Sequence, residues 1–135
     1  MRPQKVYMIV DDDLDDYDFF CAAMKEIDPK CKIVMAKNGE DALQQLGQDN
    51  FELPNYIFLD LNMPRMDGKT CLSHLKKNER LKHIPVVIYT TSSSQKHKTE
   101  TLKLGADYFL SKPASYRSIV SQLQKLLDSL SLLSK

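Results

Sequence analysis

The stretch Tyr56-Ile-Phe-Leu-Asp60-Leu-Asn-Met-Pro-Arg-Met-Asp-Gly68 decides how this chain folds and where its chemistry lies. It opens with four apolar residues, which is typical of a strand that is buried on both faces. Asp60 ends this run, where a carboxylate is unusual unless a function requires it. The step Met63-Pro64 interrupts regular structure, and Asp67-Gly68 opens a new element. The stretch predicts a buried strand that delivers one carboxylate to a loop, although Asp60 taken alone fits an ordinary turn at a strand end equally well.

Length and composition indicate one globular domain over residues 1–135. A net charge of +1 gives no electrostatic reason to expect nucleic acid or a membrane surface as a partner. We find no leader and no apolar run near the ~18 residues of a membrane span. The three cysteines lack a Cys-x-x-Cys spacing, which is typical of reduced thiols. These features predict a cytoplasmic protein.

Strand-like and helix-like segments alternate along the whole chain. The predicted strands cover residues 5–10, 32–36, 56–60, 84–90 and 106–111. The predicted helices cover residues 14–27, 40–46, 68–79 and 92–104, and a last helix begins near Ser115, a plausible N-cap. In the fourth helix only Leu102 and Leu104 are expected to be buried. This alternation predicts βαβ units and a doubly wound α/β fold, with a parallel sheet covered on both faces.

Polar side chains follow four of the five predicted strands, at the carboxyl end of each. Asp11 and Asp12 follow the first strand, Asp60 ends the third, Thr90 ends the fourth and Lys112 follows the fifth. In a parallel sheet these ends share one edge, where ligands bind at the point at which the strand order reverses. A strand order of 2-1-3-4-5 would place the first and third strands side by side. The three carboxylates would then lie within a few ångström of one another.

Three neighbouring carboxylates repel one another, and a divalent cation removes that conflict. Carboxylate oxygens, water and a phosphate oxygen suit Mg²⁺. Lys112 adds a positive charge that pairs with Asp60 at rest and with a phosphoryl oxygen later, while Thr90 offers a hydroxyl donor. The residues therefore predict a phosphoryl-transfer site with Asp60 as the nucleophile.

The sequence resembles the response regulator receiver domains of two-component signalling, of the chemotaxis-regulator type that stands alone. The resemblance covers nearly the whole chain, and its motifs occur in the family's order: Ile9-Val-Asp-Asp-Asp13, Leu59-Asp-Leu-Asn-Met-Pro-Arg-Met-Asp-Gly68, Val87-Ile-Tyr-Thr90 and Gly105-Ala-Asp-Tyr-Phe-Leu-Ser-Lys-Pro113. It implies a flavodoxin-like (βα)5 three-layer sandwich with the strand order 2-1-3-4-5. It also implies a single receiver domain without an output domain.

The resemblance implies a role for each matched residue. Asp60 would accept the phosphoryl group. Mg²⁺ or Mn²⁺ would be bound by Asp11, Asp12 and Asp60, with Asp12 the more direct ligand of the first two, and by the main-chain carbonyl of Asn62. Thr90 and Lys112 would contact the phosphoryl oxygens, and Thr90 and Phe109 would form the conformational switch. The Lys112–Pro113 peptide bond would be cis. Such a domain catalyses only its own phosphorylation and dephosphorylation, so it is not a conventional enzyme.

The implied partners are a sensor histidine kinase or a histidine phosphotransfer protein, and a downstream protein on the face formed by the fourth helix, fifth strand and fifth helix. The basic residues of the fourth helix fit either a solvated surface or such a docking face. The leucine stripe of the last helix continues through Leu130, Leu132 and Leu133, which leaves room for a homodimer contact. The phosphoryl group would act through a conformational switch or be passed onward.

Three other functions share parts of this pattern. A Mg²⁺-dependent hydrolase with an aspartyl-phosphate intermediate would have an acid two residues after the nucleophile, where Asn62 stands, and a cap domain. A degenerate receiver would lack Asp60, Thr90 or Lys112, and this chain retains all three. A flavodoxin-like cofactor binder would have a Gly/Ser/Thr-rich phosphate loop after the first strand. The receiver assignment fits the chain best.

Overall fold

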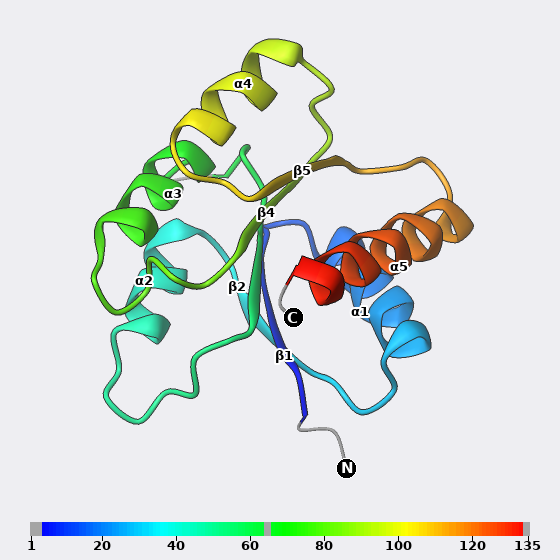
Figure 1. Ribbon diagram of the computed structural model, residues 1–135, viewed down its shortest axis with the longest axis horizontal. Coiled ribbons are helices and arrows are strands. Elements are labelled where there is room, and N and C mark those ends of the chain that lie inside the picture. Colours follow the sequence, from blue (N-terminus) through cyan, green and yellow to red (C-terminus); the bar gives the residue numbers. More distant parts are fainter. Residues whose placement is uncertain (1–3, 64–65, 134–135) are drawn as a thin grey trace.

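The computed structural model describes residues 4–63 and 66–133, with side chains placed as far as residue 129. Within these residues, a five-stranded parallel sheet lies between two layers of helices (Figure 1). The strands are β1 Val6–Val10, β2 Lys32–Ala36, β3 Tyr56–Leu59, β4 Val86–Thr90 and β5 Tyr108–Ser111. The helices are α1 Leu14–Ile27, α2 Gly39–Leu46, α3 Gly68–Lys77, α4 Gln95–Lys103 and α5 Tyr116–Leu133. The order β2-β1-β3-β4-β5 confirms the predicted doubly wound fold.

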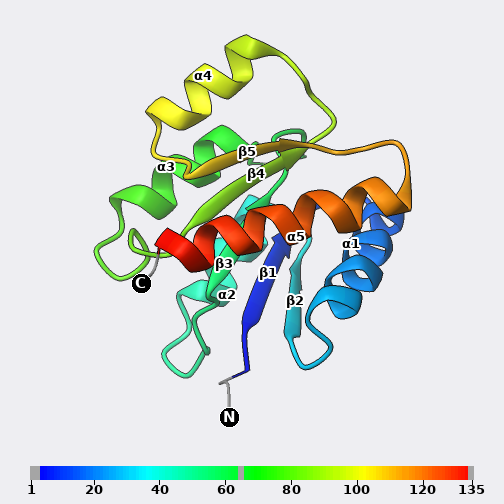
Figure 2. The same cartoon turned by 45° about the vertical axis from the view of Figure 1, so that its right-hand side comes forward.

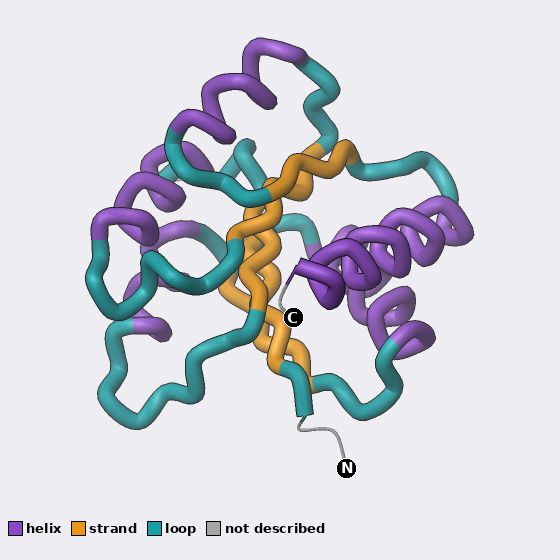
Figure 3. Tube along the Cα trace, in the orientation of Figure 1, coloured by secondary structure: helices purple, strands orange, loops and turns teal. Residues whose placement is uncertain are grey.

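Two apolar layers hold the helices to the sheet, one on each face. Figure 1 shows α1 and α5 together on one side of the strands, with α2 and α3 on the other. In Figure 2 α5 lies in front of the strands, and Figure 3 shows the strands at the centre. Alternate residues of β1 and β3 point into opposite layers, so that Met8 and Ile57 pack toward α2 and α3. Ile9 and Phe58 pack toward α1 and α5. These central strands are buried on both faces, as their continuous apolar sequence predicted.

The observed element ends agree with the predicted ones or differ from them by one to three residues. β4 begins at Val86 rather than at residue 84 because Pro85 has no N–H to donate, although its carbonyl still accepts from Ile57 N at 3.0 Å. α4 begins at Gln95 rather than at residue 92 because the Ser94 side chain caps it and accepts from His97 N. These shifts leave the topology unchanged.

The prediction that α4 buries Leu102 and Leu104 is wrong. Both leucines are exposed, and the buried residue of α4 is Thr101. Its hydroxyl donates to the carbonyls of the preceding turn, which satisfies this polar group inside the protein. The helix ends in a Schellman motif, in which Ala106 N donates to Thr101 O at 3.0 Å and Gly105 has a φ of +109°. α4 therefore presents Thr101 to the interior and both leucines to solvent.

Two further sequence expectations concern the cysteines and the last helix. Cys31 and Cys71 are buried and Cys21 is half-buried, and each is a free thiol. α5 extends to Leu133, but the side chains of Leu130, Leu132 and Leu133 lie outside the described residues. Among the helices that the structure describes, none has the length and apolar content needed to cross a bilayer.

Candidate metal centre

Hydrogen bonds that continue the sheet hold two buried carboxylates just beyond their strands. Asp11 follows β1, and its N–H donates to Ala36 O at 3.0 Å. Asp60 follows β3, and its N–H donates to Val10 O at 3.0 Å. Both residues are buried. Because β1 and β3 are neighbours in the sheet, this arrangement brings the two side chains to the same edge.

Asp12 completes a cluster with these two residues. One carboxylate oxygen each from Asp11, Asp12 and Asp60 lies within 4.8 Å of the others. Asp11 and Asp60 are buried, whereas Asp12 is exposed, so the cluster opens toward solvent on the Asp12 side. Three hard oxygen donors with access to water suit a divalent cation that keeps some of its own water ligands. The predicted convergence of the three carboxylates is confirmed.

Lys112 reaches into this cluster from the residue after β5. Its Nζ lies 2.7 Å from Asp11 Oδ2, 2.8 Å from Asp16 Oδ2 and 3.4 Å from Asp60 Oδ2. The Lys112 side chain is almost fully buried, with 7% of its surface exposed. The predicted pairing of Lys112 with Asp60 is present, but it is the longest of the three contacts.

Burial and the excess of negative charge both affect the protonation of this cluster. Burial raises the pKa of the Asp11 carboxyl, and hydrogen bonds from Lys112 and from Asp13 N offset only part of the rise. Burial alone would lower the pKa of Lys112, but its hydrogen bonds to Asp11 and Asp16 and the nearby charges raise it above its usual value. Lys112 is therefore a stable cation facing several acids, and its charge alone does not neutralise them.

Asp16 is the member of this site that the sequence pattern did not reveal. Its place in the first turn of α1 is typical of an acid that only favours the helix dipole, as Asp15 in the same turn does. The structure instead directs its carboxylate to Lys112, 96 positions away. No local spacing signals a pair so distant, because it depends on how α1 packs beside the end of β5.

The loop after Asp60 is held against the strand end. Gly68 N donates to Leu61 O at 3.1 Å, and Asn62 N lies 3.4 Å from Asp60 Oδ1. A Cβ at Gly68 would come within 2.3 Å of Asp60 O. Glycine at this position is thus required by the close approach of α3 to the backbone of Asp60.

Thr90 and Phe109 lie on the strands next to this loop. Thr90 is fully buried, and its Oγ1 accepts from Ser92 N at 3.5 Å. Phe109 is half-buried and packs against the core layer that faces α2 and α3. The register pairs Ile88 with Phe109, so Thr90 and Phe109 point to the same face of the sheet.

The peptide bond between Lys112 and Pro113 is trans, since the described residues contain no cis peptide bond. The cis bond expected from the family resemblance is therefore wrong for this structure. The trans isomer is favoured by about 0.5–1 kcal/mol at an X–Pro step, so local contacts can maintain either one. Lys112 N donates to Thr90 O at 2.6 Å, which carries the β4–β5 pairing one residue further in the trans arrangement.

Comparisons with known proteins identify the family to which this chain belongs. The model of the response regulator receiver domain family matches residues 7–124, and the chain belongs to that family. The response regulator Rcp1 of Synechocystis sp. is 32% identical over 127 residues, which cover 91% of this chain and 86% of Rcp1. The phosphorylated cyanobacterial phytochrome response regulator RcpA superposes with a TM-score of 0.86 at 26% identity, covering 92% of this chain and 91% of RcpA.

Two further observations set the scope of this assignment. A Mn²⁺-bound form of Rcp1 superposes with a TM-score of 0.82 at 29% identity, covering 90% of this chain and 91% of that one. The hybrid signal transduction histidine kinase M of Dictyostelium discoideum is 34% identical over 99 residues, which are 71% of this chain but only 4% of that protein.

Family membership and the acidic cluster together make the chain a phosphoacceptor domain with an acidic metal site rather than a conventional enzyme. The family also implies a histidine-kinase partner.

Proposed function

We propose that Asp60 accepts a phosphoryl group from a histidine kinase or a histidine phosphotransfer protein. The observation that carries the proposal is the cluster of Asp11, Asp12 and Asp60 carboxylates within 4.8 Å, with Lys112 Nζ at 3.4 Å from Asp60. An Asp60 oxygen forms the new bond to phosphorus while the bond from phosphorus to the donor nitrogen breaks. The electron pair of that bond stays on the donor histidine.

The neighbouring residues would bind the metal ion and the phosphoryl oxygens. Asp11, Asp12, Asp60 and the main-chain carbonyl of Asn62 would hold Mg²⁺ or Mn²⁺, and the cluster of the three carboxylates supports Asp12 as a direct ligand. A cation held there would neutralise charge that develops on the phosphoryl oxygens. Lys112 pairs with one phosphoryl oxygen, and the Thr90 hydroxyl donates to another.

A conformational switch follows from these contacts. Thr90 shifts toward the phosphoryl group and gives up its contact with Ser92 N, which lies in the segment leading to α4. Phe109 is supported as the second switch residue because it is half-buried on the same face of the sheet. Their movement reshapes the face formed by α4, β5 and α5, where we place the downstream protein.

We further propose that residues 1–135 act as one receiver domain. Similarity to Rcp1 and RcpA over most of the length of each supports this organisation. The three free thiols support a cytoplasmic location. A homodimer contact through the last helix remains part of the proposal, and sedimentation with and without phosphodonor would test it.

Phosphorylation by a small donor tests the role of Asp60. With Mg²⁺ and acetyl phosphate, we expect intact-mass spectrometry to show one added phosphoryl group on the native chain. The variant Asp60→Asn should stay unmodified, because an amide oxygen cannot serve as the nucleophile. Asp18→Asn, an exposed acid of α1, is the matched control and should be modified normally.

Removal of the cation gives a second arm of the same experiment. Chelation of Mg²⁺ by EDTA should abolish the mass gain in the native chain, because the acids around Asp60 would then repel the anionic donor. Equal modification of the native chain and Asp60→Asn would show that the acceptor is another residue.

A further inference from the structure

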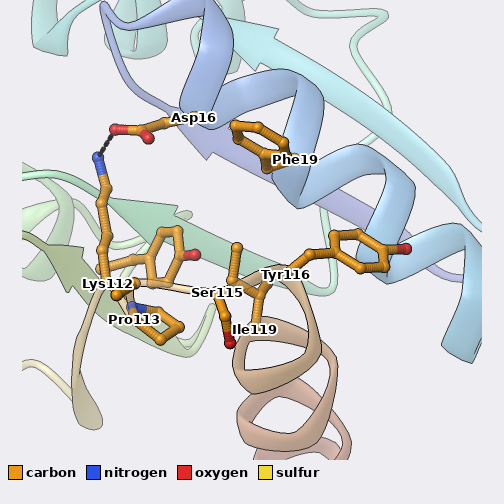
Figure 4. A pocket seen from close by; sticks show the side chains of 9 residues that line it. Asp16, Phe19, Lys112, Pro113, Ser115, Tyr116 and Ile119 are labelled. Atoms are coloured by element: carbon orange, nitrogen blue, oxygen red, sulfur yellow. Dashed lines mark hydrogen bonds and ion pairs between the residues drawn. The ribbon is translucent and has the colours of Figure 1, made fainter.

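Asp16 makes a contact with Lys112 that the phosphoryl-transfer chemistry does not need. Its carboxylate comes from α1, and Figure 4 shows the side chain reaching toward the Lys112 ammonium, with the ion pair drawn as a dashed line. The Asp16–Lys112 distance is 2.8 Å, compared with 3.4 Å for Asp60–Lys112. The lysine is thus held more closely by α1 than by the proposed acceptor.

Capping of the helix does not explain this orientation. The amides of Asp15 and Asp16 both donate to the Asp13 side chain, so the N-terminus of α1 already has its cap. Asp15 supplies a negative charge in the same turn while remaining exposed. The Asp16 carboxylate therefore has a more specific contact than an acid that only favours the helix dipole.

The position of the Lys112 ammonium, rather than the number of its donors, makes its partners compete. An ammonium has three N–H groups, enough for all three acids, but Nζ lies closer to Asp11 and Asp16 than to Asp60. For Nζ to come closer to a phosphoryl group on Asp60, it must move, and at least one of the two shorter contacts must then lengthen.

The Asp16 contact is the one that solvent can replace. The Asp16 side chain is 33% exposed, whereas that of Asp11 is 1% exposed. Asp16 and Lys112 also line a pocket together with Tyr89, whose ring centroid lies 5.7 Å from Nζ (Figure 4). Space beside the pair allows the Asp16 carboxylate to turn toward water when the lysine leaves.

We propose that Asp16 is a positioning residue that holds Lys112 toward α1 in the unphosphorylated protein and thereby slows phosphoryl transfer to Asp60. The proposal rests on the proposed function of Asp60 and Lys112. It deepens that function, because it assigns the restraint on the resting lysine to a residue outside the metal-binding cluster.

The rate of phosphorylation by acetyl phosphate at saturating Mg²⁺ tests this proposal. Asp16→Asn keeps the size of the side chain and removes its charge, so Lys112 should move toward Asp60 and the rate should rise roughly two- to five-fold, as expected for the loss of one partly exposed ion pair. Asp15→Asn is the matched control, because it removes the same charge from the same helical turn. Its rate should equal that of the native chain.

A measurement on the metal-free protein provides a readout independent of phosphorylation. The ¹⁵N signal of the Lys112 ammonium, assigned by its loss in Lys112→Gln, should shift in Asp16→Asn and stay unchanged in Asp15→Asn. An unchanged or slower rate in Asp16→Asn, or an equal acceleration in Asp15→Asn, would overturn the proposal. If the native chain accepts no phosphoryl group, the proposed function fails, and the ammonium signal still reports whether Asp16 holds Lys112.

Discussion

Gly68 shows how one missing side chain shapes the metal centre. α3 begins at this residue and approaches the backbone of Asp60 so closely that an added Cβ would lie 2.3 Å from Asp60 O and 2.7 Å from Leu61 Cα. Both neighbours are backbone atoms, which cannot turn away as a flexible side chain can. Any larger residue must therefore displace the start of α3 or the proposed acceptor.

Gly68→Ala should lower both stability and the rate of phosphorylation. Forced overpacking of this kind typically costs about 1–3 kcal/mol, and here it also shifts Asp60 relative to Lys112. Urea unfolding and phosphorylation by acetyl phosphate measure the two effects. Gly47→Ala is the control, because Gly47 has a φ of −82°, a backbone angle that alanine also adopts. This substitution should change the free energy of unfolding by less than about 1 kcal/mol. Similar behaviour of the two variants would contradict the role assigned to Gly68.

At the scale of a single element, α3 depends on its N-terminal cap. Asp67 has extended backbone angles, and its Oδ1 accepts from Thr70 N at 2.9 Å. This hydrogen bond to the backbone lowers the pKa of the Asp67 carboxyl. The cap holds the first turn of α3 beside the loop that carries Asp60, so the stability of the helix and the shape of the site are linked.

Asp67→Ala should cost about 1 kcal/mol at neutral pH, the usual value of an N-cap. Because the folded pKa of Asp67 is depressed, its contribution is present above the unfolded value near 3.9 and is lost as pH falls through the folded pKa. Urea unfolding from pH 7 down to pH 3 should therefore show the difference between native and variant shrinking below about pH 4. Asp67→Asn keeps an acceptor without a titrating group and serves as the control. A difference independent of pH would exclude the charged cap.

On the scale of the whole molecule, β5 and α4 are less firmly packed than their neighbours β4 and α3. β4 is buried along its length, whereas every residue of the edge strand β5 is half-buried. α4 buries one residue, Thr101, and an ion pair between Lys69 and Glu100 links it to α3. α3 buries four residues over a similar length. The proposed switch therefore lies where little apolar packing has to be broken.

Native-state hydrogen exchange should separate these two helices. We expect amides of α4 to exchange roughly tenfold faster than those of α3, because α4 buries fewer residues. This ratio corresponds to an opening free energy that is about 1.4 kcal/mol lower for α4 than for α3. Mass spectrometry of peptides after deuterium labelling measures both helices in one sample, so α3 is the internal control. Equal protection would argue against α4 as the weakly held part of the switch face.

The amino-acid sequence by itself determined the alternation of strands and helices, the continuous apolar strands and the acids at their ends. These features depend on local periodicity and on the residue types beside each strand, so they can be recognised without coordinates. Asp11, Asp12, Asp60, Thr90 and Lys112 were all predicted in this way as site residues. The strand order required the resemblance to a known family, because periodicity does not specify which strands pair.

Only the tertiary structure decided which partners Lys112 has, which face of α4 is buried and which isomer precedes Pro113. Asp16 and Lys112 are 96 positions apart, and the same Asp on a helix packed elsewhere would be an ordinary surface acid. Thr101 lies in the interior in place of Leu102 and Leu104 because the rotation of α4 about its axis depends on how the helix packs against the rest of the protein. Contacts of this kind depend on how elements pack against one another, and that information is spread over the whole chain rather than contained in any one segment.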